Sequence, residues 1–358
     1  LAWLDTSFWL SFGAVALLVF LHRAGAAGVL RMQVVLTLVF GLLAAGLFGV
    51  WSVSALPANL LLVPLFSLLL VPLALIDALL PASSWLSAVL MMLTDACWAL
   101  LGWFASWPSL PLPMTGFIAL LLAISLLPLL LPAWPGPRWL LLAGLLPWLW
   151  PDTPVPAPGH VELVVFDVGQ GQMMALRTRQ HLLIYDLGPG WHDGDAASRV
   201  LQPWLRRQRR EPDLVFISHG DLDHAGGIAA FPPSHYRGRL FTGETAAVPA
   251  GLPCLRGQRW WFDEVSFEVL WPPPDMPLRH SNNRSCVLMV HAANQRILLT
   301  GDIGREIEYW LAEHDDLRAD VLQVPHHGSA SSSSFALLHA VAPAQAFASA
   351  GHDNHFGH

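Results

Sequence analysis

The 358-residue sequence contains no lysine, and its 19 basic residues are all arginine, which we attribute to genomic base composition rather than to function. There are only three cysteines, at positions 97, 254 and 286, and no two of them form a C-x-x-C pair. This spacing excludes zinc-ribbon and dithiol redox motifs. Cys254 and Cys286 could pair only in an oxidising compartment, and two isolated thiols are the favoured interpretation.

Charge is scarce in the first 150 residues. The arginines and carboxylates of this segment are Asp5, Arg23, Arg31, Asp77, Asp95 and Arg138. The remainder carries 16 arginines against 23 carboxylates, an acidic excess that does not predict a nucleic-acid-binding surface. The length allows two domains, and the composition divides the chain into a lipid-compatible half and a water-soluble half.

The first half, residues 1–150, predicts a polytopic helical membrane bundle. Crossing the hydrocarbon core takes ~20 mostly apolar residues. Four stretches qualify, at 33–53, 60–80, 85–105 and 115–133, with shorter runs at 8–21 and 138–150. Basic residues favour cytoplasmic loops. With Arg23 and Arg31 inside and six spans, the soluble half would lie outside the cytoplasm.

Three polar features interrupt the apolar spans. Carboxylates in hydrocarbon usually face a polar interior, so Asp77 and Asp95 could line a channel, although Asp77 could equally lie at the membrane interface. Asn59 precedes an apolar run that contains Pro64. A proline inside a span suits the helix of a pore or a transporter.

Residues 151–159 form a proline-rich linker, and residues 160–358 predict a two-sheet sandwich covered by helices. Short strands are expected at 161–168, 173–178, 182–186, 214–218, 265–270, 286–291, 296–300 and 321–324. Helices are expected at 196–209, 305–313 and 334–340. The chain begins without an initiator methionine and ends within a loop, so we expect a fragment whose second domain is truncated at its C-terminus.

Potential metal ligands follow the ends of these strands. Four of them occupy six residues directly after the strand at 214–218: His219, Asp221, Asp223 and His224. We expect His219 and Asp221 to face one ion, and Asp223 and His224 a second. Further candidates, each in a Gly- or His-rich turn, are Asp302, His326, His327 and His358. A solvated polar loop is the disfavoured alternative, because three separate segments supply the additional ligands.

The motifs together resemble those of the ComEC family of competence membrane proteins. They comprise Asp167-Val168-Gly169-Gln170-Gly171, Asp186-x-Gly188, the segment from His219 to Gly227, Asn282-Asn283-x-Ser285, Thr300-Gly301-Asp302, His326-His327-Gly328-Ser329 and Gly357-His358. The apolar run after Asn59 is similar to part of that family's membrane competence domain. The resemblance extends over essentially the whole chain, although the family also has further membrane helices and usually a small N-terminal domain.

The resemblance implies a metallo-β-lactamase-like αββα sandwich behind a channel for single-stranded DNA in the bacterial inner membrane. The soluble domain would lie on the periplasmic side and degrade the strand that is not imported. Implied partners are single-stranded DNA, the lipid membrane and other competence uptake proteins. The implied metal ligands are His219, Asp221, Asp223, His224, Asp302, His326 and His358, and Asp186, Asn283 and Ser329 would support them.

Two divalent metal ions are expected. The wider superfamily has histidine where this chain has Asp221, and a carboxylate makes the site harder, which favours Mn²⁺, with Zn²⁺ or Mg²⁺ as alternatives. In a phosphodiesterase reaction Asp302 would bridge the ions, Asp223 would orient the nucleophile, and His327, or else His326, would stabilise the leaving oxygen.

The residues for DNA contact are less specific. Arg206, Arg207, Arg209 and Arg210 could grip phosphates, although such a run is usually a solvated face. The pair Trp260-Trp261 could stack on bases, although core packing is the more common role.

Three functions fit the sequence. The favoured one is a DNA channel with a metal-dependent nuclease domain. The second is a DNA channel whose soluble domain is a non-catalytic binding or structural module. The third is a membrane-tethered hydrolase of small esters or lactams.

Overall fold

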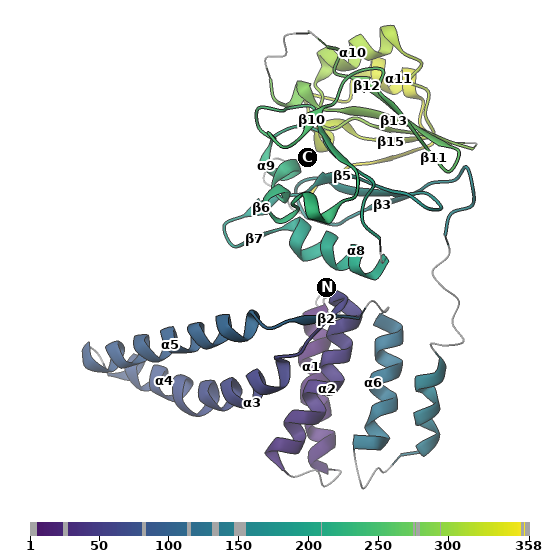
Figure 1. Cartoon of the computed structure of the whole chain (residues 1–358). Helices are drawn as coiled ribbons and strands as arrows, with labels where there is room; N and C mark the ends of the chain where they lie inside the picture. Colours follow the sequence, from purple (N-terminus) through teal and green to yellow (C-terminus); the bar gives the residue numbers. More distant parts are fainter. Residues whose placement is uncertain are drawn as a thin grey trace. The chain divides into compact units, whose positions relative to one another are not determined.

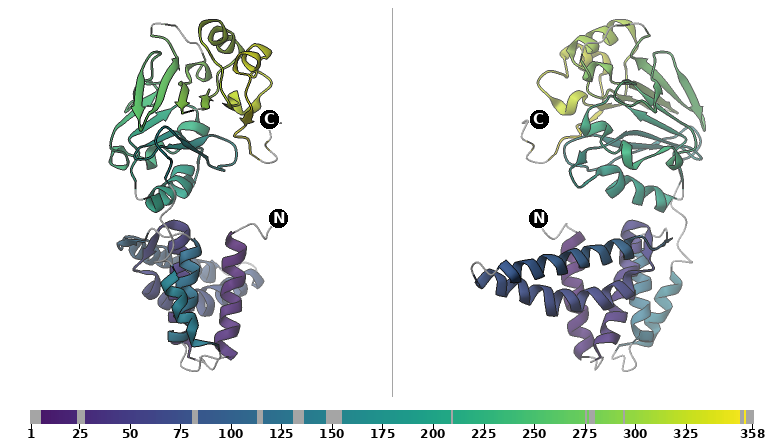
Figure 2. Two further views of the ribbon diagram at one scale, coloured as in Figure 1. Left: turned by 90° about the vertical axis from the view of Figure 1, so that its right-hand side faces the viewer. Right: turned by 60° about the vertical axis from the view of Figure 1, so that its left-hand side comes forward.

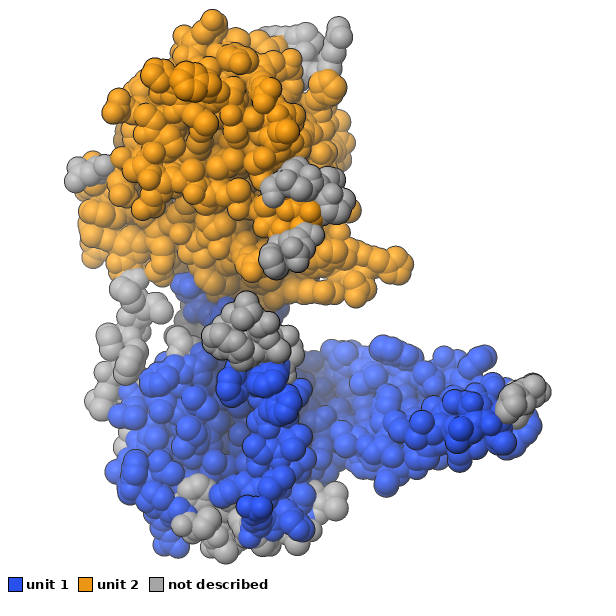
Figure 3. Space-filling view, turned by 180° about the vertical axis from the view of Figure 1, so that it is seen from behind, with its two compact units in different colours: residues 1–152, 206–208 blue, residues 153–205, 209–358 orange. Residues whose placement is uncertain are grey.

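The computed structural model describes residues 6–23, 28–80, 84–112, 116–130, 136–146, 155–208, 210–274, 276, 280–293, 295–351 and 354. The chain separates into two compact units (Figure 3). One comprises residues 1–152 with 206–208, and the other comprises residues 153–205 with 209–358. The change in composition after residue 150 therefore coincides with a physical division of the chain.

The first unit is helical. Its elements are α1 (Thr6–Arg23), α2 (Val29–Phe48), α3 (Ala55–Leu65), η2 (Phe66–Leu70), α4 (Val71–Leu79), α5 (Ser84–Ala105), α6 (Gly116–Leu130) and η3 (Arg138–Leu145), with a small antiparallel pair, β1 (Val50–Ser52) and β2 (Ser109–Pro111). Leu21, Val35, Leu42 and Ala123 form the buried contact between α1, α2 and α6. The helices from α3 to α5 form a hairpin that projects from these three (Figure 2).

Among the described residues of this unit, three helices are long and apolar enough to cross a membrane: Leu30–Phe48, Ala55–Leu79 and Trp85–Ala105. Two shorter apolar helices, Phe8–Arg23 and Gly116–Pro128, accompany them. The expected run at 138–150 is described only as far as Leu146, and its 3₁₀ helix has 8 residues. At ~2 Å per residue this helix would span ~16 Å, so the six-span count and the orientation derived from it stay predictions.

The proline-containing span stays helical but changes from α-helix to π-helix near its middle. Between Pro64 and Pro72, residues Phe66–Leu70 form a π-helical segment that joins α3 to α4. A proline removes one helical donor and crowds the preceding turn, which a wider turn accommodates. The three helical segments follow one another without an intervening loop, and a pore or transporter role for this span stays a prediction.

Polar contacts join the apolar helices of this unit. The amide Nδ2 of Asn59 donates to Thr37 Oγ1 of α2 over 3.4 Å. The Ser87 hydroxyl of α5 donates to both carboxylate oxygens of Asp77, at 2.9 and 3.1 Å. Asp95 is exposed on α5. These contacts secure the hairpin, and whether either carboxylate lines a channel stays a prediction.

The second unit contains two six-stranded sheets. The first has the order β10 (Leu252–Pro253), β9 (Arg239–Thr242), β8 (Leu214–Ile217), β5 (Leu182–Leu187), β4 (Met173–Arg177) and β3 (Glu162–Val165). The second has the order β11 (Arg259–Phe262), β12 (Val265–Trp271), β13 (Val287–Ala292), β14 (Gln295–Leu299), β15 (Val321–Gln323) and β16 (Gln345–Phe347). The eight predicted strands are all present, and no end differs by more than three residues from its predicted position.

The sheets pack face to face and helices cover both outer faces (Figure 1). Tyr185, Phe216, Phe267 and Leu288 belong to the fully buried layer between the sheets. On the outside of the first sheet lie η4 (Ala197–Leu201) and α8 (Gln202–Gln208), and on the outside of the second lie α10 (Arg305–His314) and α11 (Phe335–Val341). The predicted αββα sandwich is confirmed.

Strand direction brings the candidate ligands to one edge. In the first sheet β5, β8 and β9 are mutually parallel, and in the second β14, β15 and β16 are mutually parallel. The carboxyl ends of parallel strands meet at one edge of a sheet, where loops can converge on a ligand. Asp186, His219, Asp302 and His326 all lie at or just beyond such ends.

The expectation of two isolated thiols was wrong. Cys254 follows β10, Cys286 precedes β13, and the two form a disulfide with their Cα atoms 6.0 Å apart. Both residues are buried in the layer between the sheets. The sequence concealed the pairing because 32 positions separate two cysteines that face each other only after the sheets pack. A disulfide favours an oxidising compartment for this domain.

The disulfide gives a direct chemical prediction. Alkylation of the denatured, unreduced chain should modify Cys97 alone, and alkylation after reduction should modify all three cysteines, as intact mass would show. Replacing Cys254 and Cys286 by alanine should cost about 2–4 kcal/mol of stability. Modification of three cysteines before reduction would contradict the pairing.

Candidate metal centre

Two groups of side chains at the strand ends could each hold a metal ion. His219, His224 and Asp302 form the first group, and all three are buried. Asp223, His224 and His327 form the second. Within each group the ligand atoms lie within 4.8 Å of one another. The four-residue helix α9 (Leu222–Ala225), which follows β8, carries Asp223 and His224 into the site.

Asp302 belongs to the first group and also reaches His327 of the second, while His224 belongs to both groups. Its Oδ1 is 3.2 Å from His224 Nε2, and its Oδ2 is 3.3 Å from His327 Nε2. The carboxylate is therefore oriented with one oxygen toward each group, as a bridging ligand would require. Gln323 supports this turn from behind, because its Oε1 accepts hydrogen bonds from the backbone N–H groups of Thr300 and Gly301.

Asp186 holds the other face of His224. Its Oδ2 lies 2.8 Å from His224 Nδ1, which leaves Nε2 as the nitrogen that faces the site. The same carboxylate accepts hydrogen bonds from the Gln172 side chain and from both the N–H and the hydroxyl of Ser218. A carboxylate behind a histidine fixes its tautomer and raises its basicity as a ligand.

The turn with the two adjacent histidines has an unusual backbone. His326 and His327 have φ values of 51° and 56° and precede Gly328 at 86°. Side chains other than glycine pay for this left-handed region, and such strain concentrates at functional sites. A hydrogen bond from the His326 N–H to the Gly301 carbonyl and one between His327 Nδ1 and the Ser349 carbonyl hold the turn.

Two of the predicted candidates lie at the rim of the site. Asp221 Oδ2 is 3.4 Å from His219 Nε2, but its side chain is 45% exposed and it belongs to neither group. His326 Nε2 is 3.9 Å from Asp302 Oδ2, and it also lies outside both groups. Their roles as ligands stay predictions. His358 lies outside the described residues.

Asn283 and Ser329 were predicted to support the ligands. Asn283 accepts from the Gly304 N–H and bonds Glu306, so it supports the start of α10, whereas its neighbour Asn282 lies 3.3 Å from His326 Nε2. The hydroxyl of Ser331 contacts His326 Nδ1, and the hydroxyl of Ser329 points at Ser331. The supporting roles of Asn283 and Ser329 stay predictions.

Other supporting residues had no assigned role in the sequence. Ser285 Oγ accepts the Asp302 N–H and lies 3.4 Å from His219 Nδ1. Glu244, beyond β9, accepts hydrogen bonds from the Gly220 N–H, the Ser281 hydroxyl and the Arg284 side chain. Gln172 and Ser285 stood within recognisable motifs, but Glu244 had no sequence signal because it meets the metal loop only in three dimensions.

The carboxylates of the site are held in their ionised form. Burial opposes ionisation of Asp302, but His224 and His327 hold its pKa well below the ordinary value. For Asp223 burial again opposes ionisation, and His327 and His224 nevertheless lower the pKa. The hydrogen bond with His219 lowers the pKa of Asp221.

His224 and His327 are held in their protonated form. Burial lowers the pKa of His224, but Asp302 and Asp186 together raise it well above the ordinary value. Burial also opposes protonation of His327, and hydrogen bonds with Asp223 and Asp302 raise its pKa to about 9. The protons on these two imidazoles supply positive charge between the carboxylates.

The donor set fits divalent metal ions. His219 Nε2 and Asp302 Oδ1 are buried without a well-aligned hydrogen bond, and their ion-pair partners Asp221 and His224 lie 3.4 and 3.2 Å away. Buried polar atoms are normally fully satisfied, so both atoms are available to a bound cation. Imidazole suits Zn²⁺ and carboxylate suits Mn²⁺ or Mg²⁺, and the site offers both kinds of donor.

The predicted DNA contacts lie elsewhere on this domain. Arg206 and Arg207 are exposed on α8, whereas Arg210 donates to the Arg179 carbonyl. Arg209 lies outside the described residues. Trp260 packs against Phe216 and Phe241 between the sheets, so its alternative core role is the one observed.

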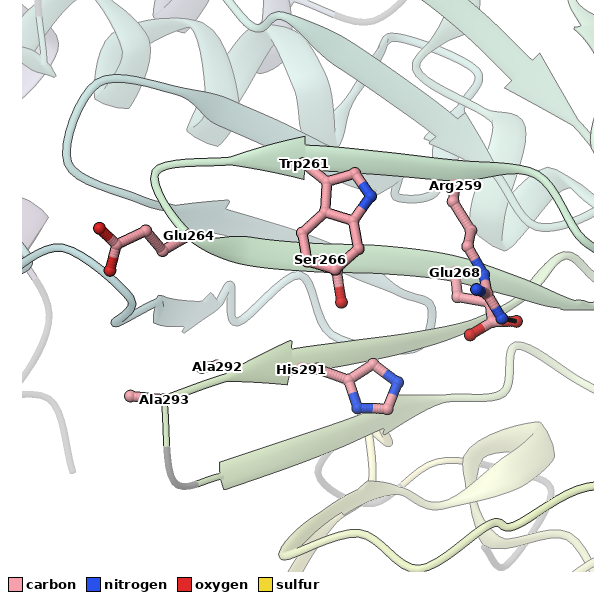
Figure 4. A pocket seen from close by; sticks show the side chains of 8 residues that line it. All are labelled: Arg259, Trp261, Glu264, Ser266, Glu268, His291, Ala292 and Ala293. Atoms are coloured by element: carbon pink, nitrogen blue, oxygen red, sulfur yellow. Dashed lines mark hydrogen bonds and ion pairs between the residues drawn. The ribbon is translucent and has the colours of Figure 1, made fainter.

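Trp261 has the opposite environment and is 70% exposed. It lies over an open groove of about 490 Å³ on the outer face of β11, β12 and β13 (Figure 4). The groove is lined by Arg259, Trp261, Glu264, Ser266, Glu268, His291, Ala292 and Ala293. None of these residues belongs to the metal groups, and the groove is distinct from the candidate centre.

Family models match both halves of the chain. Residues 1–137 match the competence protein family, and residues 166–236 match the metallo-β-lactamase superfamily. The second match covers the segment from β4 through α9, which contains Asp186, His219 and His224.

Curated relatives match the whole length. The uncharacterised protein YcaI of Escherichia coli is 32% identical over 378 residues, which cover 98% of this chain and 49% of that protein. The competence protein ComA of Neisseria gonorrhoeae is 32% identical over 376 residues, covering 100% of this chain and 52% of that protein. The chain thus spans about half the length of these relatives.

Among solved structures, a metallo-β-lactamase of Cronobacter sakazakii shares 16% identity at a TM-score of 0.36. The match covers 52% of this chain and 89% of that one. This likeness adds nothing to the family match.

The orientation of Asp302 predicts a shared ligand. Asp302→Asn should abolish tight binding of both ions, because each oxygen faces a different group, whereas His219→Ala should remove one ion. Metal analysis of the dialysed chain in detergent would count the ions. Asp316→Asn is the matched control, since that carboxylate is 77% exposed and pairs with Arg296. One ion retained by Asp302→Asn would rule out a bridge.

Metal uptake should release protons and strengthen as pH rises. Below a pKa of about 9, His327 carries a proton that a metal must displace. The apparent affinity for the metal should therefore fall about tenfold for each pH unit by which the pH is lowered, for each proton displaced. Calorimetry in two buffers of different ionisation enthalpy would count the protons. Equal affinities at about pH 7 and pH 9 would contradict the protonated state.

Proposed function

We propose that the chain serves DNA uptake and that its soluble half is a metal-dependent DNA phosphodiesterase. Residues 1–137 match the competence protein family and residues 166–236 match the metallo-β-lactamase superfamily. These two parts in this order are the organisation of the ComEC family. The observation that carries the proposal is the pair of ligand groups joined by Asp302. In this proposal the membrane half conducts a single strand of DNA, and the soluble half degrades the strand that is not imported.

The residues divide the work between holding and orienting. Two divalent cations would be held by His219, His224 and Asp302 and by Asp223 and His327, and would supply an activated water nucleophile and charge neutralisation at the phosphate. Asp186 orients the His224 ring from behind. The hydroxyls of Ser218 and Ser285 are engaged with Asp186 and with the Asp302 N–H, so neither is arranged as a covalent nucleophile.

Mn²⁺ is the favoured metal. Two of the five residues in the groups contribute carboxylates, and Asp221 adds a third at the rim. Hard oxygen donors suit Mn²⁺ or Mg²⁺, while the three imidazoles keep Zn²⁺ as an alternative.

The environment of the domain follows from its disulfide. Cys254 and Cys286 are joined within the sandwich, and disulfides persist in the bacterial periplasm rather than in the cytoplasm. This supports a multi-pass protein of the inner membrane whose soluble half faces the periplasm. There it would meet incoming DNA and other uptake proteins as partners.

Loss of one ligand tests the nuclease. The chain in detergent, supplied with Mn²⁺, should cleave labelled single-stranded DNA, and Asp223→Ala should slow cleavage about a hundredfold or more, because the second ligand group loses its carboxylate. Gel analysis of the products would measure the rates, with Asp316→Ala as the control. An intact chain that binds two ions but cleaves nothing would support a binding or structural module instead.

A further inference from the structure

A short hairpin lies directly beside the metal-binding loop. It consists of β6 (Gly190–Trp191) and β7 (Gly194–Asp195), and it leaves β5 just after Asp186 (Figure 1). The hairpin contributes no ligand to either metal group. Its position is nevertheless fixed against α9, the helix that carries Asp223 and His224.

The hairpin touches α9 through backbone atoms. A Cβ on Gly190 would lie 3.0 Å from the Gly226 carbonyl and 3.3 Å from the Leu222 side chain, and a Cβ on Gly226 would collide with the Gly190 nitrogen. Gly188 also bridges to Ala225. Such close approach explains the glycines on both sides, and it prevents the hairpin from moving independently of the metal loop.

Two side chains, Trp191 and Arg199, lie together on the face of the hairpin opposite to the one that touches α9. Trp191 is 45% exposed. The guanidinium of Arg199 lies over the Trp191 ring, 5.0 Å from its centroid. Arg199 also pairs with Asp193 over 3.4 Å, but both side chains are more than half exposed, and such pairs contribute little.

The geometry points to a platform, formed by Trp191 and Arg199, on which an unpaired nucleobase of single-stranded DNA stacks while a neighbouring phosphate contacts Arg199. Stacking on an indole ring needs a free base face, which a duplex does not offer. The platform would therefore make the centre select unpaired strands. This inference rests on the proposed phosphodiesterase function and names the part of its substrate that is recognised.

A second exposed tryptophan of this domain, Trp261, lies in a groove away from the metal groups. Trp261 shares this groove with Glu264 and Glu268, and the groove's arginine, Arg259, is paired with Glu268 over 2.5 Å. Trp261 therefore provides a matched control, an exposed indole on the same domain but away from the metal groups.

Binding without cleavage tests the platform. The full chain in detergent, with EDTA present so that no strand is cut, would be titrated into a fluorescein-labelled single-stranded thymidine oligonucleotide and into a labelled duplex, and anisotropy would be followed. Trp191→Ala should weaken single-strand binding about tenfold and leave duplex binding unchanged. Trp191→Phe should restore most of the affinity, and Trp261→Ala should have no effect.

Salt dependence tests the arginine. Arg199→Gln should reduce the slope of log affinity against log salt by about one, as expected for the loss of one phosphate contact. The platform is overturned if the chain does not bind the single strand, if Trp191→Ala binds as the unchanged chain does, or if only Trp261→Ala weakens binding. Cleavage in Mn²⁺ is measured separately. If single-strand binding depends on Trp191 but no cleavage is seen, the platform is retained and the nuclease is rejected. If the chain cleaves DNA but Trp191→Ala binds the single strand as the unchanged chain does, the nuclease is retained and the platform is rejected.

Discussion

The buried carboxylate of Asp186 joins the parts of the metal centre. It receives hydrogen bonds from Gln172 after the first hairpin turn and from the backbone and side chain of Ser218 at the end of β8, and it lies 2.8 Å from His224 Nδ1 on α9. A buried polar group must be hydrogen-bonded to be tolerated. The segments that form the first sheet's share of the site are thus held in one arrangement by a single side chain. Asp186 itself adopts a φ of 61°, a conformation that aspartate tolerates better than most residues.

The second sheet completes the site through the direction of its strands. Asp302 follows β14 and His327 follows β15, and these two strands are parallel, so their turns emerge at the same edge. The antiparallel strand β13 begins at this edge, which places Ser285 under Asp302 and beside His219. Neither sheet has a complete ligand set of its own. The centre therefore depends on the packing of the two sheets, and the core between them serves function as well as stability.

Most of the architecture could be predicted from the sequence, because apolar strands, turn residues and ligand motifs are local signals. The strands ending at Ile217 and Leu299 and the helix after Arg305 are examples. The features that the sequence could not show are contacts between residues that are far apart in the sequence and meet only in the folded chain. Glu244 meets Gly220, Cys254 meets Cys286, and Asn282 rather than Asn283 reaches His326 only because loops from different strands converge. The two-residue strands β6, β7 and β10 are too short to have a periodicity.

The charge balance of the metal centre bears on how the domain folds. Protonated His224 and His327 lie among the carboxylates of Asp223 and Asp302, so these charges have counter-charges. Folding then does not have to wait for a metal, unlike in domains whose ligands would repel one another or remain unpaired. Metal binding becomes an exchange of protons for cations within a site that the fold has already assembled.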